Sequence, residues 1–167
     1  MIKNIAYSVA FIIIAALLES TLLRRLAVYH AVPDIALGIL VFSSYSNGVM
    51  TGQLTGFFSG LALDFLSAAP LGLNALVRTI AGALSGLVRG VFIADTIFLP
   101  MTLCGAATAL KALLLFLLHI LFAEGVRAYP LREPLFWVEL ALNIFIAPFL
   151  FALLRRFSSL LVNRKGV

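Results

Sequence analysis

Two residues of opposite charge lie at the ends of glycine series and could form an ion pair inside a membrane. Asp64 follows one series of glycines at four-residue spacing, and Arg78 precedes a second series at the same spacing. The two series comprise Gly48, Gly52, Gly56 and Gly60, and then Gly82, Gly86 and Gly90. If the chain turns near Pro70, Asp64 and Arg78 lie at similar depth, where an ionisable group needs a partner or water. The sequence therefore predicts an intramembrane ion pair between these two residues.

Each glycine series forms one continuous face of a helix, because residues four apart lie on the same side. We call the two series the glycine ladders. A stripe without side chains lets another helix approach closely in lipid. The ladders are expected to pack their two helices against each other. The alternative is that they offer a face to a second subunit, including a second copy of the chain in a homodimer.

Other polar side chains fall in the half of the membrane that we assign to the outer side. This expected outer polar cluster consists of Glu19, Asn74, His119, Glu139 and Asn143. The cluster and the ion pair could line a cavity for a partner helix or a lipid-linked ligand. The alternative is structural: the pair locks two helices together, and the other side chains reach water or headgroups. Lys111 lies near the middle of an apolar run, so we expect an acidic or carbonyl partner inside the bundle.

The composition is that of a membrane protein. Hydrophobic residues make up 63% of the 167 residues and charged residues 11%, whereas about 25% of the residues in an ordinary soluble domain are charged. Mean hydropathy is +1.13. The formal net charge of +5 would suggest nucleic acid or anionic partners for a soluble protein. Here we interpret the basic C-terminal end, with Arg155, Arg156, Arg164 and Lys165, as a topology signal and a contact with membrane lipids, and expect no nucleic acid.

Apolar runs and breaks predict an all-α integral membrane protein with about six spans in one polytopic domain, residues 1–167. The first span covers 4–23, and Pro33 and Asp34 open the second, since both residues favour helix starts. The uncharged stretch 35–63 exceeds one comfortable crossing and divides at the turn-rich segment 43–48 into a short second span and a ladder-bearing third. Three further spans follow at 73–88, 96–122 and 135–154, with polar connections at 89–95 and 124–134. Six spans place both termini on one side, and the distribution of cations favours the cytoplasm.

Patterns that carry catalytic chemistry are missing from the sequence. Ser59 and Ser85 lack the Gly-x-Ser-x-Gly spacing of a nucleophile elbow. The two histidines, His30 and His119, have no Cys or carboxylate at ligand spacing, so we predict no metal site. Asp64 is the one aspartate expected deep in a span, and an aspartyl protease needs two. We therefore expect no enzyme activity, no cofactor and no catalytic residue.

The ladder region resembles the signature of a known family. Gly-Phe-Phe-Ser-Gly-Leu-Ala-Leu-Asp at 56–64, followed by Pro-Leu-Gly-Leu-Asn-Ala-Leu at 70–76, is similar to the bacterial rod shape-determining MreD family. The upstream Pro33-Asp34 is similar to that family's start of an early span, and Gly72 falls within its motif. Length, span count and the basic C-terminal end resemble the family over essentially the whole chain.

The resemblance implies a non-enzymatic scaffold subunit of the rod complex in the bacterial inner membrane, which maintains cell shape during cell wall elongation. It implies an MreC-like periplasmic coiled-coil protein, an MreB-like filament and the polymerase and transpeptidase of peptidoglycan synthesis as partners. The family also looks similar in architecture to substrate-capturing subunits of energy-coupling-factor transporters. A vitamin-capturing subunit is therefore the alternative, and an autonomous channel is disfavoured because the charges cluster at one depth.

Overall fold

The computed structural model describes residues 2–21, 31–67, 69–90, 97–122, 126 and 134–162, which form seven helices. These are α1 (Ile2–Thr21), α2 (Ile35–Asn47), α3 (Val49–Leu66), α4 (Leu73–Leu87), α5 (Phe98–Leu121), α6 (Pro134–Arg156) and α7 (Ser158–Leu161). The first six match the six predicted apolar segments in order. Of the expected connections at 89–95 and 124–134, residues 91–95, 124–125 and 127–133 lie outside the described residues, as do Arg164 and Lys165.

Among the described helices, α1, α5 and α6 are long and apolar enough to cross a bilayer. Helices α2 and α4 are apolar but have 13 and 15 residues. At 1.5 Å per residue they measure about 20 Å and about 22 Å, less than the roughly 30 Å of the hydrocarbon core. The chain is thus a helical membrane protein, and six complete crossings remain a prediction.

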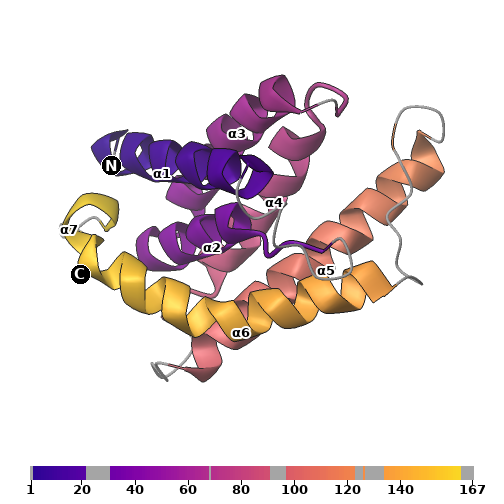
Figure 1. Ribbon diagram of the computed structural model, residues 1–167. Coiled ribbons are helices and arrows are strands. Elements are labelled where there is room, and N and C mark those ends of the chain that lie inside the picture. Colours follow the sequence, from indigo (N-terminus) through magenta and orange to yellow (C-terminus); the bar gives the residue numbers. More distant parts are fainter. Residues whose placement is uncertain are drawn as a thin grey trace.

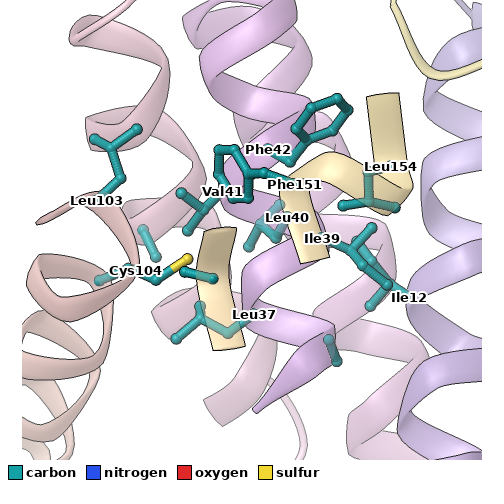
Figure 2. Packing of buried hydrophobic residues seen from close by; sticks show 14 of the residues in the cluster. Ile12, Leu37, Ile39, Leu40, Val41, Phe42, Leu103, Cys104, Phe151 and Leu154 are labelled. Carbon is teal, nitrogen blue, oxygen red and sulfur yellow. The ribbon is translucent and has the colours of Figure 1, made fainter. Parts of the chain in front are cut away.

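Helix α2 is the centre of the bundle, with α1, α3, α4, α5 and α6 packed around it (Figure 1). Its residues 36–44 are all buried, as expected for a helix that is apolar on every side. Figure 2 shows Leu37, Leu40 and Phe42 of α2 meeting side chains of α1, α5 and α6. The Phe42 and Phe151 rings lie 5.2 Å apart between centroids, nearly perpendicular at 85°. The core is therefore built around the shortest of the six main helices.

Helices α3 and α4 pack against each other through the glycine ladders, as predicted from the four-residue glycine spacing. A Cβ added at Gly52 would meet the carbonyl oxygen of Gly82, and one added at Gly56 would meet the carbonyl oxygen of Arg78. At Gly60 it would lie 2.5 Å from the Cα of Ala75. Both backbones thus come together where side chains are absent, which is the small-residue packing typical of membrane helices.

The outermost glycines of the ladders, Gly48 and Gly90, form turns. Gly48 has a φ of 92° and joins α2 directly to α3. Gly90 lies after α4 with a φ of 77°, and a Cβ added there would meet no atom within 4 Å. The expectation that Gly90 belongs to the packing stripe is therefore wrong. Gly48 belongs to the stripe as well as to a turn, because a Cβ added at Gly86 would lie 2.7 Å from the Gly48 carbonyl carbon. Glycine adopts the positive φ at both positions without strain.

One end of the bundle is basic. The backbone carbonyl of Asn47 accepts a hydrogen bond from Arg89, and the side-chain amide of Asn47 donates one to the Leu161 carbonyl. The ends of α2, α4 and α7 therefore meet. The start of α1 lies at this end too (Figure 1). Lys3, Arg89, Arg155 and Arg156 are all exposed here. From the distribution of cations we expect this end in the cytoplasm, and that orientation stays a prediction.

The glycine packing generates a prediction that uses the same substitution at two helical glycines. Gly56→Ala places its methyl group against α4 backbone, which cannot yield without separating the helices, whereas Gly105→Ala meets only the flexible Ile144 side chain. Overpacking typically costs about 1–3 kcal/mol, so Gly56→Ala should lower the melting temperature in detergent. Samples heated to a series of temperatures and analysed by size-exclusion chromatography give this melting temperature. Equal melting temperatures for the two variants would show that the ladders do not hold α3 to α4.

Candidate functional site

The carboxylate of Asp64 binds the start of α4. Its two oxygens accept hydrogen bonds from the backbone N–H groups of Gly72 at 2.9 Å, Asn74 at 2.9 Å and Ala75 at 3.2 Å, and from the Asn74 side chain at 3.0 Å. The first N–H groups of a helix have no partner within it and carry partial positive charge. Asp64, at the end of the preceding helix, therefore acts as the cap that Gly72 cannot provide.

Arg78 pairs with a different acid from the one expected. Its Nη2 lies 3.3 Å from Oδ1 of Asp34, the residue before α2. The predicted pair of Arg78 with Asp64 is wrong. The α4 N-terminus satisfies Asp64 completely, and Arg78 lies more than one turn farther along α4, where its side chain reaches the start of α2.

Lys111 contacts two acidic side chains, as predicted for a cation near the middle of an apolar run. Its Nζ lies 2.7 Å from Oδ2 of Asp34 and 2.8 Å from Oε1 of Glu139. Asp34 thus receives a cation on each oxygen, and Lys111 bridges two carboxylates. We call Asp34, Arg78, Lys111 and Glu139 the charge network. It connects the start of α2 to α4, α5 and α6, with side chains that are 9–22% exposed.

Acceptors from three parts of the chain meet the N–H groups at the start of α2. The Asp34 side chain accepts from Leu37 N–H at 2.8 Å, as the predicted helix start requires. Glu19 accepts from Ala36 N–H at 2.7 Å, and the Asn143 Oδ1 accepts from Asp34 N–H at 2.8 Å. Unpaired backbone groups are costly in apolar surroundings. These side chains therefore allow a helix to begin within the bundle.

A cavity of about 680 Å³ lies beside the charge network. Polar side chains on its wall come from Glu19, Ser20, Asp34, Ser67, Asn74, Arg78, Lys111 and Glu139. Apolar side chains of Ala16, Leu17, Leu63 and Leu66 form much of the rest. The wall combines the end of α1, the start of α2, the end of α3 and the start of α4 with residues of α5 and α6. We call it the network cavity.

The expected outer polar cluster is only partly brought together. Glu19, Asn74 and Glu139 line the network cavity. Asn143 is buried behind it, where its Nδ2 donates to the Thr108 hydroxyl at 2.9 Å. His119 does not line this cavity; its Nδ1 donates to the Val126 carbonyl at 2.6 Å. Placing His119 in the cluster was wrong, because it lies two turns beyond Lys111 on α5.

The residue that sequence reasoning undervalued is Asp34. Its position after a proline identified it as a helix start, and the family motif included it. Nothing in the spacing indicated that Arg78 and Lys111 would both reach it. The available signal was a charge count: if Asp64 pairs with Arg78 alone, Lys111 needs a second buried acid.

The charge network generates a test by removal of its bridging cation. Lys111→Met leaves Asp34 and Glu139 facing each other without the ammonium between them. Breaking a buried ion pair typically costs about 3–5 kcal/mol, and the partial exposure of Lys111 places the expected loss at the lower end. The melting temperature in detergent should fall clearly, and adding Glu139→Gln should recover part of it. Lys3→Met, at an exposed site, is the matched control; an equally small effect of both would contradict the network's structural role.

Comparisons with known proteins agree with the pattern of the sequence and the helical fold. Residues 1–157 match the family described as rod shape-determining protein MreD. Neither the curated proteins nor the solved structures contain a match to the chain. The family match covers every element that builds the charge network and the glycine ladders. The chain therefore belongs to the MreD family of rod shape-determining membrane proteins.

Proposed function

We propose that this chain is a non-enzymatic scaffold subunit of the bacterial rod complex, which works by binding other proteins of the cell wall elongation machinery. The observation that carries this proposal is the family match over residues 1–157. The polar groups described above also support it, because they hydrogen-bond to one another and to helix starts. Such contacts stabilise helix packing, which is what a scaffold requires.

The proposed partners follow from the family. They are an MreC-like periplasmic coiled-coil protein, an MreB-like filament, and the polymerase and transpeptidase that make peptidoglycan. The protein lies in the inner membrane as one domain with six spans and both termini in the cytoplasm. The basic end of the bundle, with exposed Lys3, Arg89 and Arg155, then faces the filament.

Partner helices bind to faces other than the glycine ladders, which α3 and α4 cover for each other. A second copy of the chain in a homodimer needs another face for the same reason. Large apolar side chains are exposed on several helices, including Phe57 of α3, Phe98 of α5 and Phe145 of α6. These faces meet either lipid or a partner.

The six-span topology can be tested at the two ends of α3. Single cysteines at Ser46 and Ser67, introduced with Cys104→Ala, should differ in reactivity toward a membrane-impermeant maleimide in intact cells. Six spans predict that only the Ser67 position is labelled from outside, since α3 separates the two. Labelling of both from the same side would show that α3 does not cross the membrane.

The proposed partners can be tested by cross-linking in native membranes. A photoreactive phenylalanine analogue replaces Phe57, Phe98 or Phe145 in turn, all of them exposed, and buried Phe151, which is 2% exposed, is the matched control. After affinity purification, mass spectrometry should recover the MreC-like protein or a wall synthase from at least one exposed site and none from Phe151. Recovery of an ATPase module in place of wall proteins would contradict the scaffold function.

A further inference from the structure

Two groups on the wall of the network cavity are left unsatisfied by the charge network. Arg78 has nine-tenths of its side chain buried and places Nη2 on Asp34, but its Nη1 has no hydrogen-bond partner among the described residues. Glu19 accepts one backbone N–H, and no described cation lies within ion-pair distance of it. A buried donor without an acceptor is costly, and so is an unpaired carboxylate at membrane depth. A ligand that contacted both groups would therefore stabilise them.

The two unsatisfied groups lie close enough to contact one ligand. Glu19 binds the N–H of Ala36 and Arg78 binds the side chain of Asp34, so both are anchored on the first turn of α2. Both also line the same cavity. Both residues therefore border the space that a single molecule in the cavity would occupy.

The formal charges of the cavity wall decide the chemistry of this ligand. Arg78 and Lys111 supply two positive charges, and Glu19, Asp34 and Glu139 supply three negative ones. An anion alone would satisfy Arg78 but meet an excess of carboxylates. A simple cation would satisfy Glu19 but leave the free nitrogen of Arg78 without an acceptor. The complementary ligand carries both an ammonium group and an acidic oxygen.

The size and lining of the cavity favour an amphiphile. Its volume of about 680 Å³ lies within the roughly 300–1,000 Å³ typical of ligand pockets. Leu17, Leu63 and Leu66 on the wall suit methylene groups. The wall includes residues from the end of α1, the end of α3 and the start of α4, so the cavity lies beside helix ends.

We propose that the network cavity binds a phosphoethanolamine group, with the ammonium on Glu19 and the phosphate on the free nitrogen of Arg78. The membrane phospholipid with this headgroup is the source that the apolar wall favours. Free phosphoethanolamine carries the same ammonium and phosphate groups, and the first experiment distinguishes it from the lipid. This inference does not rest on the proposed scaffold function, and either can fail without the other.

The first experiment compares headgroups on the unmodified protein. Delipidated protein in mild detergent receives phospholipids with identical acyl chains and ethanolamine, choline or glycerol headgroups, and native mass spectrometry counts the bound molecules. The ethanolamine lipid should be retained about ten-fold more strongly than the other two, because choline lacks N–H donors and the glycerol lipid lacks the cation. Equal retention of all three would overturn the proposal. Free phosphoethanolamine is then added as a competitor. If it displaces the bound lipid as effectively as added ethanolamine lipid does, the phosphoethanolamine site is supported and its ligand is a soluble molecule.

The second experiment changes the two ligand-binding groups conservatively. Glu19→Gln keeps an acceptor for Ala36 N–H and removes the charge, and Arg78→Lys keeps a cation for Asp34 and removes the second nitrogen. Each should reduce the preference for the ethanolamine lipid about ten-fold, while Gln53→Ala, at an exposed site of α3, should leave it unchanged. An unchanged preference in both folded variants would refute the assignment. Where a variant does not fold, the headgroup series decides.

A third measurement identifies the occupant in native membranes. A photoreactive residue at Leu66, on the cavity wall, should cross-link mainly to phospholipid. Cross-linking mainly to a protein helix would overturn the proposal, because the cavity would then be a docking site for a partner.

Discussion

Helix α2 begins inside the bundle, and its first N–H groups need acceptors that lipid cannot provide. Asp34, Glu19 and Asn143 supply them from three separate parts of the chain. Two of these acceptors are acids, and a buried acid in turn needs cations. Arg78 and Lys111 meet that need for Asp34. One short helix therefore explains why charges from four other helices converge on its N-cap, Asp34, in an otherwise apolar protein.

The glycine packing of α3 and α4 determines where one of these cations lies. Gly56 lies against the backbone of Arg78 itself, so one of the close contacts between the two helices is at the residue whose guanidinium reaches Asp34. Asp64 adds a second constraint, because its carboxylate holds the first turn of α4. The two contacts together fix the depth of Arg78 in the bundle. The ladders thus act on the charge network through helix position, not through any polar contact of their own.

Sequence patterns predicted what is local and missed what depends on neighbours. The apolar runs gave six helices in order, the four-residue glycine spacing predicted close packing, and Pro33-Asp34 predicted a capped helix start. The partner of Arg78 could not be read in the same way. Spacing tells which face of a helix a charge lies on, but not which helix lies opposite, and a carboxylate such as Asp64 is satisfied by backbone N–H groups as well as by a cation.

Polar groups whose hydrogen bonds and ion pairs are formed inside the bundle are not available to bind a partner. Asp64 and Lys111 are satisfied internally, and the ladders are covered. Exposed apolar faces distinguish a partner helix from lipid only by shape, because lipid is as apolar as they are. Specific recognition is therefore expected at two places. One is the basic end, through its exposed cations, and the other is the network cavity, where Glu19 has only a backbone hydrogen bond and Nη1 of Arg78 has no partner among the described residues. The fold thus separates the polar contacts that hold it together from those that remain available for binding.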